Sequence, residues 1–362
     1  MRFQNYLNKA ERLLQKPVPE KIKRVNFAIT YACNSECIMC DIWKKYKVEP
    51  QVAKEELTLE EIRQLFTQSQ CLRSLDEIIL TGGEPFVRKD FVPIYTFFRE
   101  AFPGAKVVVS TNGLPTGAIL KKVEAIMDFE KEPPLLLISS IDGLEATHDA
   151  VRGVKGGYRR TLNTLQQIQK LYPIQQSLSF TIMPENYFDL VEVYELSKKL
   201  GVGFTMRFAQ NSKIYYLNEG FNIGWTETQL TEVDRLITKV IRDLRQRRDL
   251  FSKLFSSDLY FYSRMVDYQG NPRRMFTCYS GVHSFFLNPW GEVYPCVIRE
   301  DSIGNVRKNS FDELWLSYTA QQIRQSIAAK ECHCWIECET CTSLQRDPSL
   351  LGDNIIRELS IL

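Results

Sequence analysis

Segments with the patterns of strands and of helices alternate six times between residues 24 and 249 of this 362-residue chain. Short apolar runs predict strands at residues 25–30, 77–80, 106–110, 135–141, 177–183 and 203–207. Amphipathic patterns predict helices at residues 58–70, 89–101, 116–128, 159–171, 188–200 and 227–249. This alternation is typical of a parallel sheet covered by helices, and six such units predict an open, partial barrel.

Three cysteines follow the first predicted strand, in the loop Tyr31-Ala-Cys-Asn-Ser-Glu-Cys-Ile-Met-Cys40. In βα barrels, functional groups gather at the carboxyl ends of the strands. Three thiolates, from Cys33, Cys37 and Cys40, can hold three irons of a 4Fe-4S cubane and leave the fourth iron without a protein ligand. A structural zinc ion needs four ligands, which a lone triplet does not supply. The loop therefore predicts a 4Fe-4S cluster with one open iron.

The second predicted strand ends in Thr81-Gly-Gly-Glu-Pro-Phe86. The glycines Gly82 and Gly83 allow a close approach of the backbone to a ligand. Glu84 and the neighbouring carbonyl groups can accept hydrogen bonds from an ammonium group, and Pro85 completes the turn. We predict that this segment binds a ligand that carries an amino group.

Small polar side chains end the next two predicted strands, in Ser110-Thr-Asn-Gly113 and Ser139-Ser-Ile-Asp-Gly143. Such hydroxyl and amide groups suit ribose hydroxyls and a carboxylate. The alternative is turn formation alone, because Asn-Gly and Asp-Gly are strong turn formers.

The Cys-x3-Cys-x2-Cys loop, one βα unit before Gly82-Gly-Glu-Pro85, resembles the radical S-adenosylmethionine (SAM) superfamily. The resemblance implies a partial (β/α)6 TIM-type barrel, a SAM molecule at the open iron, and catalytic roles for the three cysteines. Met39 departs from the aromatic residue that is common at its position. By the same resemblance, we expect the following residues to bind SAM: Gly82, Gly83, Glu84, Pro85, Thr111, Asn112, Ser140, Asp142, Arg152 and Arg207.

Two of these assignments are more specific. Ser140 is the expected ribose contact. Arg152 lies in His148-Asp-Ala-Val-Arg-Gly153 and would pair with a carboxylate of SAM or of the substrate, although a solvated surface arginine is the alternative.

A second group of cysteines lies near the carboxyl end of the chain. Cys278 and Cys296 flank a predicted β-hairpin formed by residues 285–287 and 292–294, and a predicted turn, Cys332-His-Cys-Trp-Ile-Glu-Cys-Glu-Thr-Cys341, follows. Ser310 and Glu313 fit a helix capping box between them. Residues 278–341 resemble the SPASM domain or its shorter twitch form, which carry auxiliary 4Fe-4S clusters.

Six cysteines do not supply four thiolates to each of two cubanes. We expect one auxiliary cluster held by Cys278, Cys296, Cys338 and Cys341. Cys332 and Cys334 are then structural thiols, or they belong to a second, incomplete cluster with His333 or another ligand. A zinc ion is the alternative metal for four thiolates.

The sequence predicts five regions: an N-terminal helix (1–21), the barrel (22–210), a bridging helical segment (211–275), the auxiliary-cluster domain with its hairpin (276–345) and a C-terminal tail (346–362). The net charge is +2, from 46 basic and 44 acidic residues, so we expect no nucleic-acid partner. The first eight residues of the sequence lack the apolar core of a signal peptide, no stretch of 18 apolar residues occurs, and the cysteines are clustered. We therefore expect no membrane span and a cytoplasmic location.

The resemblance implies reductive cleavage of SAM to a 5′-deoxyadenosyl radical, which abstracts hydrogen from a substrate. Expected partners are a small-molecule or peptide substrate and an electron donor such as flavodoxin or ferredoxin. The auxiliary cluster would accept an electron or bind the substrate. One alternative is a non-catalytic iron-sulfur protein, which would not need the ammonium-binding turn. Another is a cyclase similar to the molybdenum-cofactor enzyme, which lacks this hairpin pattern.

Overall fold

The computed structural model describes residues 22–254 and 256–346. The predicted N-terminal helix at 1–21 lies outside the described residues, as does the predicted tail beyond Arg346. No described helix combines the length and the apolar composition that a membrane span requires.

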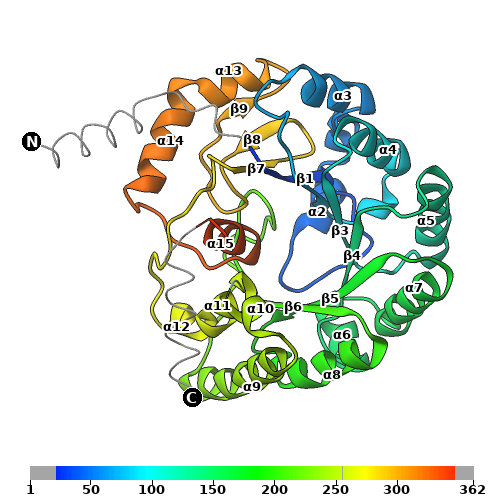
Figure 1. Ribbon diagram of the computed structural model, residues 1–362, viewed down its shortest axis with the longest axis vertical. Coiled ribbons are helices and arrows are strands. Elements are labelled where there is room, and N and C mark those ends of the chain that lie inside the picture. Colours follow the sequence, from blue (N-terminus) through cyan, green and yellow to red (C-terminus); the bar gives the residue numbers. More distant parts are fainter. Residues whose placement is uncertain (1–21, 255, 347–362) are drawn as a thin grey trace, which may run out of the picture.

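The described strands form one sheet in the order β6-β5-β4-β3-β2-β1-β7-β8-β9. Strands β1 to β6 are parallel neighbours and curve into an open barrel (Figure 1). Their bounds are β1 Arg24–Thr30, β2 Glu77–Gly82, β3 Lys106–Thr111, β4 Leu135–Ser140, β5 Gln175–Ile182 and β6 Gly203–Phe208; those of the C-terminal strands are β7 Ser284–Leu287, β8 Glu292–Tyr294 and β9 Gly304–Asn305. The predicted partial barrel is confirmed.

The six predicted helices form within three residues of their expected bounds and cover the outside of the barrel (Figure 1). They are α3 Leu59–Gln68, α4 Phe91–Ala101, α5 Thr116–Phe129, α7 Gly157–Leu171, α8 Leu190–Leu200 and α9 Glu227–Gln246. The others are α2 Ile42–Val48, α6 Glu145–Arg152, α10 Leu250–Leu254, α11 Ser257–Ser263, α12 Met265–Gly270, α13 Phe311–Leu316, α14 Tyr318–Ala328 and α15 Glu337–Leu344. The expected capping box of Ser310 and Glu313 starts α13.

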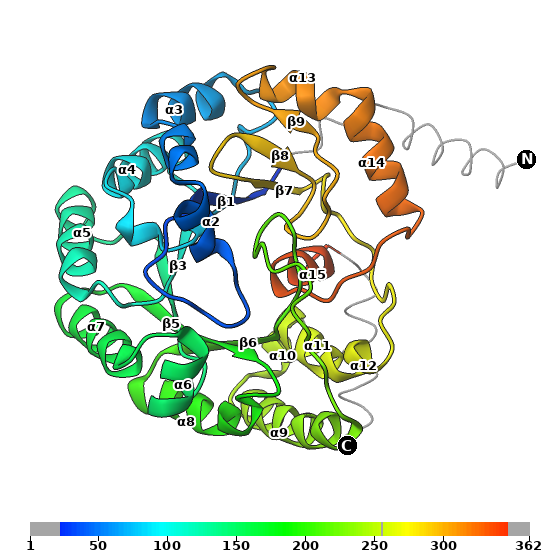
Figure 2. The same cartoon turned by 180° about the vertical axis from the view of Figure 1, so that it is seen from behind.

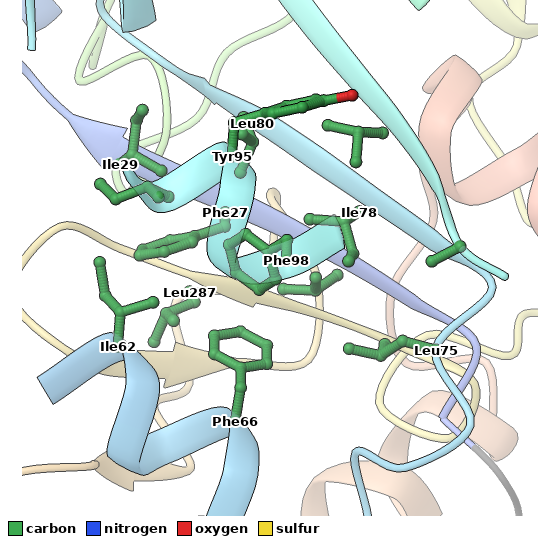
Figure 3. Close-up of a cluster of buried hydrophobic side chains, with 14 of the residues drawn as sticks. Phe27, Ile29, Ile62, Phe66, Leu75, Ile78, Leu80, Tyr95, Phe98 and Leu287 are labelled. Atoms are coloured by element: carbon green, nitrogen blue, oxygen red, sulfur yellow. The ribbon is translucent and has the colours of Figure 1, made fainter. Parts of the chain in front are cut away.

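Alternate residues of the barrel strands face opposite sides of the sheet. On β1, Phe27 and Ile29 point outward into the main core, where they meet the helical side chains Phe66 and Phe98 (Figure 3). Asn26 on the same strand is buried on the inner side, in the lumen. The outer face of the sheet therefore holds the fold together, and the inner face is free to carry polar groups.

The predicted hairpin is confirmed, because β7 and β8 pair in antiparallel fashion. The sequence did not indicate that β7 also pairs in parallel with β1 and so continues the barrel sheet. The predicted turn at the final cysteines is wrong in part: Cys338 and Cys341 lie on helix α15.

Helix α15 lies on the open side of the barrel, between the hairpin and β6 (Figures 1 and 2). Asn26 Nδ2 on β1 donates to Glu339 Oε1 across 3.2 Å. Arg207 Nη1 on β6 donates to Glu337 Oε2 across 2.8 Å. One helix thus joins the first and last strands of the partial barrel.

Candidate functional site

The three cysteines of the loop after β1 line a cavity of about 130 Å³ at the carboxyl ends of the barrel strands. Burial raises the pKa of Cys33 to about 12, and it raises the pKa values of Cys37 and Cys40 as well. A thiol of this kind releases its proton when a metal ion binds to the sulfur. Among the described residues, no three metal-binding side chains are already close enough together to hold a metal ion.

Gly82 and Gly83 also line this cavity, and close packing explains why both are glycines. A Cβ atom on Gly82 would lie 2.1 Å from the Thr30 carbonyl oxygen, and one on Gly83 would lie 2.3 Å from the Ala32 carbonyl oxygen. Gly83 N donates to the Thr30 oxygen across 2.8 Å. The glycines therefore seat the end of β2 directly on the cysteine loop.

Glu84 is fully buried and does not itself line the cavity. Its carboxylate accepts hydrogen bonds from the Thr111 hydroxyl across 3.0 Å and from Asn112 N across 2.7 Å. Burial raises the pKa of Glu84 to about 7, although these donors oppose the increase. Pro85 starts the short turn Pro85–Val87 and is also buried outside the cavity lining. That Glu84 and Pro85 contact SAM stays a prediction.

Thr111, Asn112 and Ser140 line the cavity, as their positions at strand ends predicted. Asn112 Nδ2 donates to Asn34 Oδ1 across 2.7 Å and to Ser35 Oγ across 2.9 Å. The end of β3 is therefore tied to the cysteine loop, as is the end of β2.

Arg152 and Arg207 reach the cavity as well. Arg152 forms an ion pair of 2.6 Å with Asp142, which is completely buried outside the cavity lining. The surface alternative for Arg152 is excluded, because its side chain is only 12% exposed. Arg207 Nη2 donates to Ser179 Oγ across 2.8 Å, in addition to its ion pair with Glu337.

A second cavity, of about 240 Å³, lies in the barrel lumen and reaches Cys338 and Cys341 on α15. Five residues line both cavities: Thr81, Ser110, Arg207, Tyr215 and Tyr216. The Tyr215 hydroxyl lies 2.6 Å from Thr81 Oγ1, and Asp41 N donates to the Tyr216 carbonyl oxygen across 2.8 Å. The cavity at the cysteine loop and the cavity that reaches Cys338 and Cys341 therefore adjoin each other in the lumen.

Sequence reasoning missed Tyr215, Tyr216 and Thr181 as cavity residues. Thr181 carried a usable signal, because it lies near the end of β5 as Ser140 lies at the end of β4. The two tyrosines follow β6 in a segment without regular structure, where the pattern of residues gave no indication of the lumen.

Three of the C-terminal cysteines, Cys278, Cys296 and Cys338, lie near enough to Cys334 to interact with it electrostatically. Burial raises the pKa of Cys334, and the neighbouring Cys278 and Cys338 thiols raise it further. Cys296 is buried, and Cys334 is among the groups that raise its pKa. Cys341 lies on the lumen side, and Cys332 accepts a hydrogen bond from Arg274 Nη2 across 2.9 Å. The predicted quartet of Cys278, Cys296, Cys338 and Cys341 stays a prediction, as does the role of Cys334.

The donor sets fit iron-sulfur clusters. One loop presents three thiols to a cavity, and the C-terminal region brings further thiols to the same lumen. Thiolates in these numbers are the usual ligands of cubane clusters, and three of them leave an iron free for a second ligand.

Comparison with known proteins agrees with this geometry. Residues 27–197 match the radical SAM superfamily, and residues 278–342 match the SPASM domain, described as an iron-sulfur cluster-binding domain. The AdoMet-dependent heme synthase of Methanosarcina barkeri is 26% identical over 80% of this chain and 81% of its own. The sporulation killing factor maturation protein SkfB of Bacillus subtilis is 24% identical over 84% of this chain and 67% of its own.

Among solved structures, SuiB of Streptococcus suis bound to S-adenosylmethionine superposes with a TM-score of 0.62 at 14% identity. The match covers 89% of this chain and 72% of SuiB, and it concerns the fold. The relatives are enzymes, so the electron-carrier alternative is set aside. The protein uses SAM, a 4Fe-4S cluster and auxiliary iron-sulfur clusters. The chain belongs to the radical SAM superfamily and carries a C-terminal SPASM domain.

Proposed function

We propose that the protein abstracts hydrogen from a substrate held in the barrel lumen and completes an oxidation with the help of its C-terminal cluster. The observation that carries this proposal is the shared lining of the two cavities, by Thr81, Ser110, Arg207, Tyr215 and Tyr216. A substrate in this lumen contacts the SAM site on one side and the C-terminal thiols on the other. The reduced cluster and SAM together supply a 5′-deoxyadenosyl radical, and the protein supplies binding and orientation.

The chain's own residues position and enclose the substrate. The hydroxyl groups of Thr205 and Tyr215 and the Arg207–Glu337 ion pair offer polar contacts, whereas Ile79, Val108 and Ile138 offer an apolar wall. Thr205 Oγ1 is buried without a hydrogen-bond partner, so it is ready to bind a substrate polar group. Helix α15 closes the open side and limits the access of water to the radical.

The substrate is a peptide, a protein side chain or a small molecule, and the reaction is a dehydrogenation, another oxidation or a crosslinking. The names of the relatives support both substrate classes, since they include heme synthases and proteins of bacteriocin and killing-factor maturation. The electron for SAM cleavage comes from a flavodoxin or ferredoxin in this proposal. The C-terminal thiols would hold a cluster that could supply electron-accepting or substrate-binding chemistry beside the lumen.

SAM cleavage tests the first step. The reconstituted protein is reduced with dithionite without oxygen, SAM is added, and 5′-deoxyadenosine is measured by mass spectrometry. We expect product from the wild type and none from the Cys33/Cys37/Cys40→Ala variant. Cys71→Ala is the matched control, because Cys71 lies outside both cavities. A wild type with full iron content and no 5′-deoxyadenosine would refute the proposal.

Metal counts on the triple alanine variant test the C-terminal site separately. About four irons per chain indicate one auxiliary cubane and about eight indicate two. Zinc alone would exclude both arrangements and remove the second half of the proposal.

A further inference from the structure

The end of helix α6 is attached to the cysteine loop through the backbone. Glu36 N donates to the Arg152 carbonyl oxygen across 3.1 Å, and Ile38 N donates to the Val151 oxygen across 3.0 Å. Gly153 ends the helix with φ of 63°, and a Cβ atom there would lie 2.4 Å from the Glu36 carbonyl oxygen. These contacts lie on both sides of Cys37 and fix the position of Arg152 relative to it.

The Arg152 side chain is fixed as firmly as its backbone. Its Nη2 atom lies 2.6 Å from Asp142 Oδ2, and Asp142 Oδ1 accepts a hydrogen bond of 2.7 Å from Thr181 N. The Asp142 carbonyl oxygen is also held, by Asn186 Nδ2 across 3.1 Å. Strand β5 and the turn after it therefore fix the carboxylate that aims the guanidinium.

From this position, Arg152 Nη1 donates to Cys37 Sγ across 3.6 Å. The contact is a direct N–H···S hydrogen bond to a cysteine that binds iron in the proposed site. Hydrogen bonds to the sulfurs, together with net charge and solvent exposure, set the reduction potential of an iron-sulfur cluster. Reduction adds one electron to the cluster, so a cationic donor favours the reduced state.

We infer that Arg152 is a positioning residue for the cluster of Cys33, Cys37 and Cys40, and that its hydrogen bond to Cys37 raises the reduction potential of this cluster. The inference rests on the proposed function, since it concerns the cluster that would reduce SAM. Asp142 has the supporting role of directing the guanidinium. Reduction takes one electron from an external reductant and breaks no bond in the protein.

A different role for Arg152 is the binding of the SAM carboxylate. The two roles differ in a measurable way, because the hydrogen bond to Cys37 exists without SAM. The reduction potential of the cluster in the absence of SAM therefore reports the hydrogen bond, and the affinity for SAM reports the carboxylate contact.

The test is a potentiometric titration of the reconstituted full-length protein, followed by electron paramagnetic resonance without SAM. The relevant signal is the one missing from the Cys33/Cys37/Cys40→Ala variant. The variants are Arg152→Gln and Arg152→Lys, and the control is Arg235→Gln, which removes an exposed arginine of α9 that pairs with Glu232. Iron content is measured for each variant.

In Arg152→Gln we expect the equilibrium constant for reduction to fall about tenfold, which is a shift of about 59 mV to lower potential for one electron. Arg152→Lys keeps the charge but not the planar fork, so we expect an intermediate potential. Arg235→Gln should match the wild type.

A potential equal to that of the wild type in Arg152→Gln, with weakened SAM binding, would overturn the inference and assign Arg152 to the carboxylate. If Arg152→Gln fails to hold the cluster, the potential of Arg152→Lys decides, and a value equal to the wild type overturns the inference. A wild type that holds the cluster without cleaving SAM refutes the proposed function instead, and the comparison of potentials still stands.

Discussion

The Arg207–Glu337 ion pair should contribute measurably to stability, because it joins the barrel to α15. The two side chains are 27% and 20% exposed, and their charged atoms lie 2.8 Å apart. Removing one partner of a fully buried pair costs about 3–5 kcal/mol, and an exposed pair contributes about 0.2–1 kcal/mol. For these partly buried groups we expect Glu337→Gln to lower the free energy of unfolding by about 2 kcal/mol.

Urea unfolding of the reduced, metal-free protein, followed by circular dichroism, measures this effect. With a slope of about 3 kcal/mol per molar urea, the midpoint should fall by about 0.7 M. Glu195→Gln is the control, because Glu195 pairs with Lys198 at the surface across the same 2.8 Å and is 54% exposed. A shift for Glu337→Gln no larger than that of the control would refute the reasoning.

Three further predictions concern the SAM site. Gly83→Ala should displace the cysteine loop, because its Cβ atom would lie 2.3 Å from the Ala32 carbonyl oxygen, and the iron content of the protein should fall. Gly104→Ala is the control, because a Cβ atom there meets nothing within 4 Å, and its iron content should equal that of the wild type. Ser140→Ala should weaken equilibrium SAM binding about fivefold to tenfold through loss of one hydrogen bond, and an unchanged affinity would exclude Ser140 as a ribose contact.

The third of these predictions concerns pH. Burial raises the pKa of Glu84 from 4.5 to about 7. The folded protein therefore binds a proton more tightly here than the unfolded chain does. Its stability contribution is complete below pH 4.5 and falls by about 3 kcal/mol as the pH rises through 7. Thermal unfolding of the metal-free protein across this range should show a decrease that is smaller in Glu84→Gln, and equal pH dependence would contradict the assignment.

The barrel could be predicted because each βα unit carries its own local pattern. The apolar runs of β1 to β6 are buried against helices, so periodicity and turn residues located them within a few residues. The capping box at Ser310 was equally local, since its two partners are three residues apart.

The connections between distant segments could not be predicted in this way. The pairing of β7 with β1 joins residues far apart in sequence, and no local pattern encodes it. Helix α15 was expected to be part of a turn, and its segment Glu-Cys-Glu-Thr-Cys carries no apolar periodicity that would indicate a helix. Glu339 on this helix makes buried polar contacts with Ser280, Ser284 and Asn26, all of which lie far from it in sequence. Cavity residues at strand ends were predictable, whereas Tyr215 and Tyr216 were not, because their segment has no regular structure and is held by contacts with residues far away in sequence, such as Asp41 and Thr81.

The bond between Asn26 and Glu339 spans 313 positions of the chain. Contacts of such long range form late in folding, because a large loop must close first. Since α15 carries Cys338 and Cys341, the lumen is completed in the same step that brings these thiols to the barrel. During synthesis the cysteine loop can already be held by β2, β3 and α6, whereas the lumen would remain open to solvent on its α15 side until residue 344 has been made. We therefore expect proteolysis of ribosome-bound chains to show early protection of the cysteine loop, and protection of the lumen residues Tyr215 and Tyr216 only after residue 344 has emerged.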